Sequence, residues 1–124
     1  MARIGFARVS TQKQDLAEQL IALKNVGCEK IFAGKHSGKA ESNKQQLNEL
    51  LNYIRDGDVV IVTKLDRLGR SLSQCLQVLD IFQEKNVSFI ALDQGINTEK
   101  RNDPMSLAMI QLLGIFAELE RNFI

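Results

Sequence analysis

The sequence DGDVVIVTK, residues 56–64, decides the fold of this 124-residue chain. Four consecutive apolar residues, Val59 to Val62, follow a turn signal made of two aspartates and a glycine. An apolar run without polar alternation is typical of a strand that is buried on both faces, as in a parallel sheet covered by helices. We therefore expect this stretch to be an inner strand of an α/β domain.

Strands and helices are predicted to alternate on both sides of this stretch. From the apolar spacing and the flanking glycines we expect further strands at residues 3–9, 30–33 and 87–92, and helices at residues 15–26, 45–55 and 72–85. Such alternation favours right-handed crossovers and a mainly parallel sheet of four to five strands flanked by helices. The α/β domain is expected to occupy residues 1–103 and to end in a loop, INTEKRNDP.

Residues 104–124 are expected to begin a long helix, because Pro104 suits a first helical turn. One side follows a heptad spacing through Met105, Met109, Leu112, Phe116, Leu119 and Phe123, and the other side contains Leu107, Ile110, Leu113 and Ala117. A helix that is apolar on both sides needs two burial partners, so we expect a second chain on the heptad side; the alternative is an intramolecular core helix. The chain stops without a capping signal, which indicates truncation within an oligomerisation helix.

The composition is that of a globular protein of about one domain. Sixteen Lys and Arg against fifteen Asp and Glu give a net charge of +1, so a nucleic-acid surface must be a local patch. Cys28 and Cys75 lie far apart without a CxxC motif, which favours buried thiols in a reducing cytosol over a zinc site. Without a membrane-length apolar run or a signal-peptide pattern, the chain is expected to be soluble and cytoplasmic.

Polar segments follow the first three predicted strands, at residues 10–14, 34–44 and 63–71. Because the carboxyl ends of parallel strands share one edge of a sheet, we expect these segments to converge there. His36 is the only histidine, which leaves no Ser-His-Asp set, and we interpret it as a surface-loop residue and not as a metal ligand. The glycines form no GxxxxGK[ST] pattern, so a nucleotide-binding module is disfavoured.

The first predicted strand contains a cation, Arg8, in the otherwise apolar run IGFARV. A guanidinium in a buried strand is costly unless an anion meets it. Arg8 therefore either pairs with a carboxylate or waits for an anionic ligand. Ser10 lies two residues further along, so we expect its hydroxyl on the same side of the strand; alternatively, it simply caps the next helix.

The third polar segment adds the cations Lys64, Arg67 and Arg70. We expect Arg67 and Arg70 one helical turn apart on the same face, the alternative being a solvated helix face paired with Asp66. A hydroxyl among guanidiniums suits phosphoryl transfer, because arginine forks match phosphate oxygens and neutralise charge that grows on a pentacoordinate phosphorus. Such a site would need no metal ion.

Three segments carry a resemblance that runs along essentially the whole chain: ARVSTQKQ (7–14), KLDRLGRS (64–71) and AELERNFI (117–124). They resemble the signature segments of the serine recombinases, the resolvase and invertase family. The resemblance implies a site-specific DNA recombinase whose serine, here Ser10, attacks a DNA backbone phosphate. The products of that step are a covalent 5′-phosphoserine link and a free 3′-hydroxyl.

The resemblance also implies roles for the surrounding polar residues. Arg8, Arg67 and Arg70 would hold the scissile phosphate, and Asp66 would orient the arginines and assist proton transfer to the leaving oxygen. Further contacts near the DNA phosphate are assigned to Gln14, Gln19, Lys44, Lys64, Glu120 and Arg121.

The same resemblance implies how the domain works with partners. It implies that the substrate is double-stranded DNA and that a homodimer becomes a tetramer at synapsis. It also allows accessory DNA-bending proteins as partners, and it implies that the protein is associated with the nucleoid in a bacterial cytoplasm. No metal ion, nucleotide or other cofactor is implied. A helix-turn-helix DNA-binding domain, absent from this chain, would follow the long helix.

Three positions depart from the family pattern. Phe6 stands where tyrosine is common, Gly34 where an acidic residue is usual, and Lys44 where an arginine is usual. Lys44 keeps a positive charge but loses the bidentate fork of arginine. The alternative hypothesis is therefore a catalytically weakened or inactive relative that acts as a DNA-binding or oligomerising regulator.

Overall fold

The computed structural model describes residues 2–9, 12–35, 39–99 and 104–122, without the side chains of residues 39, 40, 104–106, 109, 121 and 122. Within these limits the chain forms, in order, β1 (Arg3–Ala7), α1 (Lys13–Asn25), β2 (Lys30–Ala33), α2 (Lys39–Tyr53), β3 (Val59–Val62), the 3-10 helix η1 (Leu65–Leu68), α3 (Leu72–Glu84), β4 (Ser88–Ala91), β5 (Ile96–Asn97) and α4 (Pro104–Asn122).

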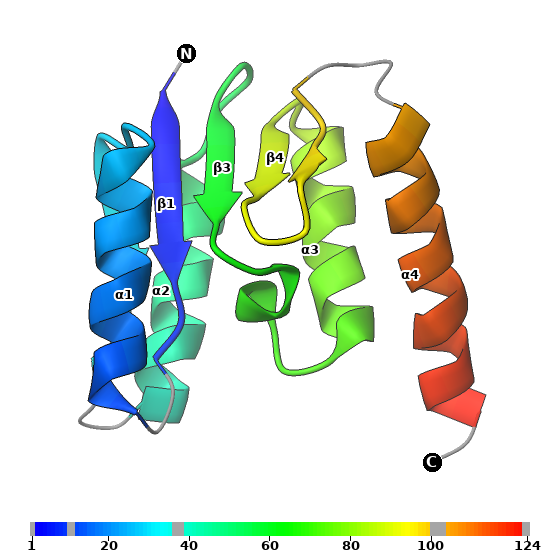
Figure 1. The fold of residues 1–124 in the computed structure, drawn as a ribbon, viewed down its shortest axis with the longest axis horizontal. Coiled ribbons are helices and arrows are strands. Elements are labelled where there is room, and N and C mark those ends of the chain that lie inside the picture. The colour runs from blue at the N-terminus through cyan, green and yellow to red at the C-terminus, as the bar shows by residue number, and fades with distance from the viewer. Residues whose placement is uncertain (1, 10–11, 36–38, 100–103, 123–124) are drawn as a thin grey trace.

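The strands form one sheet in the order β2-β1-β3-β4-β5. All neighbours are parallel except β4 and β5, which are antiparallel. This confirms the predicted α/β class with a mainly parallel sheet. Figure 1 shows α1 and α4 at opposite ends of the molecule, with α4 beside α3.

The apolar run Val59–Val62 is β3, and all four of its side chains are fully buried. Val60 and Val62 belong to the core cluster that includes Leu50 of α2 and Val78 of α3. On the opposite face of the sheet, the side chains that share a second cluster are Val59, Ile61 and three leucines of α1, Leu16, Leu20 and Leu23. Helices therefore cover both faces of the sheet, as the run without polar alternation predicted.

The helix α2 begins at Lys39, so the prediction of a polar loop up to residue 44 was wrong. Its predicted apolar face is confirmed, since Leu50 and Ile54 are buried and Leu47 and Leu51 pack against the same cluster. The first turns of α2 are polar because they contact the strand ends: Ser42 and Asn43 accept backbone N–H groups from outside the helix.

Two further boundaries differ from the prediction. The first strand ends at Ala7 and not at Val9. Within the predicted loop INTEKRNDP, Ile96–Asn97 forms β5, which pairs with β4 after a reversal at Gly95, where φ is +68°. A two-residue strand is too short to produce a periodic pattern, and tertiary pairing alone reveals it.

The helix α4 presents two different sides. Ala117 is buried, and Ile110 and Leu113 pack against the main core cluster. Exposed on the other side are Leu112, Ile115, Phe116 and Leu119. The described part of the heptad pattern therefore faces outward, and its coverage by a second chain stays a prediction. No helix in the described ranges is both long and apolar enough to cross a membrane.

Close packing at Gly5, in the middle of β1, can be tested. An added Cβ would lie 3.1 Å from Leu23 Cδ1, 3.2 Å from Cys28 Sγ and 3.3 Å from Ile31 Cγ1. We expect Gly5→Ala to lower the free energy of unfolding by about 1–3 kcal/mol through overpacking. Urea unfolding measures this effect. Gly114→Ala, where an added Cβ meets nothing within 4 Å, is the control and should destabilise nothing.

Candidate functional site

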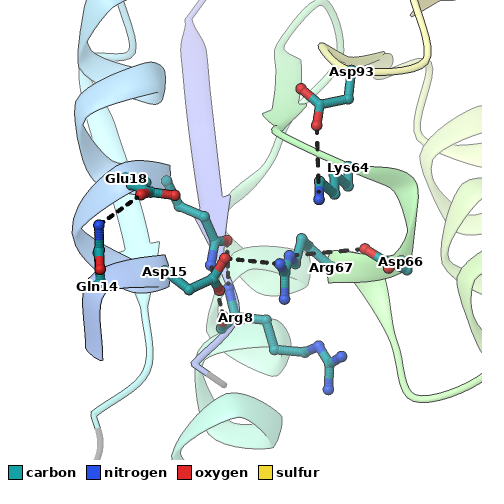
Figure 2. A network of polar contacts seen from close by, with 9 residues as sticks. Arg8, Gln14, Asp15, Glu18, Lys64, Asp66, Arg67 and Asp93 are labelled. Carbon is teal, nitrogen blue, oxygen red and sulfur yellow. Dashed lines mark hydrogen bonds and ion pairs between the residues drawn. The ribbon is translucent and has the colours of Figure 1, made fainter. Parts of the chain in front are cut away.

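The polar segments after β1 and β3 converge beside the start of α1, at the carboxyl edge of the sheet (Figure 2). Arg8 directly follows β1, Arg67 lies in η1, and Asp15 and Gln19 project from the first turns of α1. Hydrogen bonds join these four residues into one network. The predicted convergence of these two segments is therefore confirmed. Ser10 and His36 lie outside the described residues.

Gln19 fixes the backbone of Arg8. Its Oε1 accepts the Arg8 N–H at 3.3 Å, and its Nε2 donates to the Arg8 carbonyl at 3.0 Å and to Asp15 Oδ2 at 2.9 Å. The Gln19 side chain is buried, with only 3% of the residue exposed. Gln19 therefore acts on the site through the backbone of Arg8 and the carboxylate of Asp15.

Asp15 is the carboxylate that holds Arg67. Its Oδ1 accepts a hydrogen bond from an Arg67 terminal nitrogen at 3.0 Å, and the two side chains are only 25% and 14% exposed. Asp66, which the sequence favoured as the orienting carboxylate, lies 3.8 Å from Arg67 Nε and is 73% exposed. Sequence reasoning missed Asp15; its spacing of four from Gln19 on a helix was the available signal.

The Nε atoms of Arg8 and Arg67 are buried and have no hydrogen-bond partner among the described groups. A buried N–H without an acceptor costs about 1–3 kcal/mol. A ligand oxygen would remove that cost, and an arginine edge is suited to an anionic oxygen. These two atoms therefore mark a candidate oxyanion site next to the Asp15–Gln19 network.

Arg67 and Arg70 do not share a helix face, which corrects the prediction. The helix η1 ends at Leu68, Gly69 has an extended backbone, and α3 begins only after Ser71, whose hydroxyl caps it. Arg70 is exposed, and its backbone N–H donates to Gln74 Oε1 at 2.7 Å. Because extended backbone at Gly69 and Ser71 separates η1 from α3, the position of Arg70 does not follow from that of Arg67.

The remaining predicted residues are spread around this edge and beyond it. Lys64 pairs loosely with Asp93 at 3.9 Å, and Gln14 donates to Glu18 at 3.3 Å. Both Lys44 on α2 and Glu120 on α4 are exposed. Figure 1 shows the C-terminal end of α4 at the same end of the molecule as the carboxyl ends of β1 and β3. The Arg121 side chain is outside the described part.

Both cysteines are free thiols, as predicted; Cys28 is half-buried and Cys75 is buried. Burial raises the pKa of Cys75 to about 11, the Asp66 charge adds to this rise, and the Arg8 charge opposes it. Burial also raises the pKa of Cys28, against the charge of Arg3.

The raised pKa of Cys75 predicts how stability changes in alkali. The folded thiol titrates near 11 and the unfolded thiol near its ordinary value of 9.0, so the unfolded chain loses this proton first as the pH rises. The contribution of the protonated Cys75 thiol to the free energy of unfolding is complete below pH 9 and is lost as the pH rises toward 11. In urea unfolding at pH 8, 9 and 10, the free energy of unfolding should decline less with rising pH for Cys75→Ala than for the wild type. Equal declines would contradict the assignment.

The Asp15–Arg67 pair predicts an energetic coupling. Asp15→Ala should lower the free energy of unfolding by about 1–3 kcal/mol, because it leaves a mostly buried cation without its carboxylate. Together with Arg67→Ala and the double variant, it forms a double-mutant cycle measured by urea unfolding. Asp66→Ala is the control and should change stability little, since Asp66 is largely exposed. If Asp66→Ala lowered the free energy of unfolding more than Asp15→Ala, Asp66 and not Asp15 would be the carboxylate that holds Arg67.

Comparison with known proteins places the chain in a family. Residues 3–124 match the family described as "Resolvase, N terminal domain". The chain therefore belongs to this family, that of resolvase and invertase catalytic domains of site-specific recombinases, as the signature segments predicted.

Relatives in sequence and structure cover nearly all of the chain. It is 37% identical to the transposon Tn917 resolvase of Enterococcus faecalis over 120 residues, and 37% identical to a DNA-invertase of Enterobacteria phage P7 over 121 residues. These alignments cover 97% and 98% of the chain but 63% of either relative, which is less than two thirds.

Two solved structures have the same fold. A resolvase family site-specific recombinase from Streptococcus pneumoniae has a TM-score of 0.77 and 28% identity, with 98% of this chain and 89% of that one covered. The N-terminal catalytic domain of TP901-1 integrase has a TM-score of 0.69 and 25% identity, with 98% of both chains covered.

Proposed function

We propose that this chain is the catalytic domain of a serine site-specific recombinase that breaks and rejoins double-stranded DNA. One observation carries the proposal: the Nε groups of Arg8 and Arg67 are buried and have no hydrogen-bond acceptor among the described residues, at the edge where the chain continues to Ser10. A DNA phosphate supplies the missing anionic oxygens. Under this proposal the anionic ligand of Arg8 is the scissile phosphate.

In the proposed reaction the Ser10 hydroxyl oxygen attacks the phosphorus of a backbone phosphate. A bond forms between that oxygen and phosphorus as the hydroxyl gives up its proton. The bond from phosphorus to the 3′ oxygen breaks, and the leaving oxygen gains one proton to become a 3′-hydroxyl, so the net transfer is of one proton from Ser10 to the 3′ oxygen. The reverse displacement by a 3′-hydroxyl rejoins the strand, so the phosphoserine bond conserves the energy of the original linkage. No cofactor enters this scheme.

The arginines are proposed to stabilise the charge that grows on the phosphate oxygens. Arg8 and Arg67 bind those oxygens through their free edges, and exposed Arg70 approaches from the start of α3. Gln19 holds the Arg8 backbone and Asp15 holds the Arg67 guanidinium before substrate arrives, which reduces the reorganisation needed during reaction. Asp66, largely exposed beside Arg67, is assigned to proton transfer at the leaving oxygen.

The wider assembly is also a proposal. Residues 1–103 form the catalytic unit, residues 104–124 begin the oligomerisation helix, and a helix-turn-helix domain reads the site. The exposed apolar face of α4 joins subunits into a dimer and, at synapsis, a tetramer, aided by DNA-bending proteins, in a bacterial cytoplasm. DNA phosphate contacts are assigned to Gln14, Lys44, Lys64, Glu120 and Arg121.

Covalent attachment to DNA tests the proposal. The full-length gene product is incubated with nicked duplexes tiled across the flanks of its own coding region and separated on a denaturing gel. We expect a shifted protein–DNA band with the wild type and none with Ser10→Ala, because the attacking oxygen is removed. Ser71→Ala, which removes only a helix cap, is the control and should keep the band. Bound DNA without any adduct would favour the alternative of an inactive regulator.

A further inference from the structure

The strand β1 extends beyond its partners in the sheet. Its pairing with β3 ends at Gly5 and its pairing with β2 ends at Ala7, yet the chain runs on in the same direction toward Ser10. The polar backbone groups of Arg8 and Val9 therefore need partners from outside the sheet. They obtain them from two side-chain amides.

Gln19 holds Arg8, as described above, and Asn43 holds Val9 in the same manner. The Val9 N–H donates to Asn43 Oδ1 at 2.8 Å, and Asn43 Nδ2 donates to the Val9 carbonyl at 3.0 Å. The Val9 side chain is itself buried. The residue before Ser10 is thus fixed through both of its backbone polar groups and through its side chain.

A carboxamide is the side chain that this contact requires. It offers one acceptor oxygen and one donor nitrogen, whereas an ionised carboxylate only accepts and alanine offers neither. Asn43→Asp therefore keeps the shape and the acceptor for the Val9 N–H, but it replaces the donor to the Val9 carbonyl with an oxygen and adds a negative charge. That variant isolates the contact from the packing of α2.

Gly34 permits Asn43 to come this close. A Cβ at Gly34 would lie 2.4 Å from Asn43 Oδ1, 3.0 Å from Val9 Cγ2 and 3.3 Å from Ser42 Oγ. Ser42 Oγ also accepts the Lys35 N–H at 2.7 Å, which ties the same turn of α2 to the end of β2. Any side chain at Gly34, an acidic one included, would push Asn43 away from Val9.

We propose that Asn43 is a positioning residue for the attacking serine: by clamping the Val9 backbone it sets where the next residue presents its hydroxyl. The inference rests on the proposed function and deepens it. Asn43 acts through the backbone and leaves the phosphate to the arginines. Loss of the clamp should slow attack without weakening DNA binding, because a displacement of about 1 Å costs on the order of 100-fold in rate.

The kinetic test uses the full-length protein and a nicked duplex that gives an adduct with the wild type. We expect Asn43→Asp and Asn43→Ala to lower the single-turnover rate of adduct formation about 100-fold, while the DNA affinity of the uncharged variant Asn43→Ala changes less than about 3-fold. Asn48→Ala, on an exposed position of the same helix, is the matched control and should change neither value. Wild-type rates in folded Asn43→Asp would overturn the proposal.

A double variant tests the steric link to Gly34. Gly34→Ala alone should slow adduct formation, because the new methyl group displaces Asn43. In the Asn43→Ala background the same change should slow it much less, since the clamp is already gone. Equal slowing in both backgrounds would show that Gly34 acts independently of Asn43 and would contradict this link.

Amide hydrogen exchange provides a readout that does not depend on activity. In Asn43→Ala, which removes the acceptor, the Val9 N–H should exchange faster, while the Arg8 N–H, held by Gln19, keeps its protection. Unchanged exchange at Val9 would contradict the clamp even in a fully active enzyme. A wild type without a Ser10-dependent adduct would instead contradict the proposed function, and the exchange experiment would still decide the clamp.

Discussion

A backbone N–H or C=O that leaves a sheet must find another partner, and this constraint at the end of β1 organises the site. The two amides that meet it come from helices on opposite faces of the sheet. Gln19 belongs to α1, whose Leu23 is buried on one face, and Asn43 belongs to α2, whose Leu50 is buried on the other. Core packing therefore fixes the amides, and the amides fix the strand end.

The electrostatics of the site depend on the same framework. Within the network the Arg67 guanidinium pairs with the partly buried carboxylate of Asp15 and lies 3.8 Å from the largely exposed Asp66. Arg8 adds a second cation at the same edge, although the whole chain carries a net charge of only +1. Asp15 occupies one edge of Arg67, whose Nε has no hydrogen-bond acceptor in the part of the chain that the structure describes. The site is thus ordered before a ligand arrives and retains the capacity to bind an anion.

The sequence predicted the parts of the fold that local pattern determines and missed those that depend on long-range contact. Val59 to Val62 has an unambiguous pattern, because burial on both faces removes polar residues. Asp15 and Asn43 carry no such pattern: their partners lie 52 and 34 residues away, and in sequence both resemble ordinary polar helix residues. The extended Gly69, which separates Arg67 from Arg70, was equally invisible to helical spacing.

The departures at Gly34 and Lys44 invited the hypothesis of a weakened enzyme, and the geometry gives one of them another meaning. Gly34 leaves the space in which Asn43 reaches Val9, so the missing acidic side chain is coupled to a contact that orders the strand end. Lys44 is the next residue of α2 and stays exposed, where it keeps its charge near this edge. Gly34 and the Asn43 amide pack together, so the effect of a substitution at either residue depends on the other. An acidic side chain placed at Gly34 alone would therefore remove the clamp, because its Cβ would overlap the Asn43 amide.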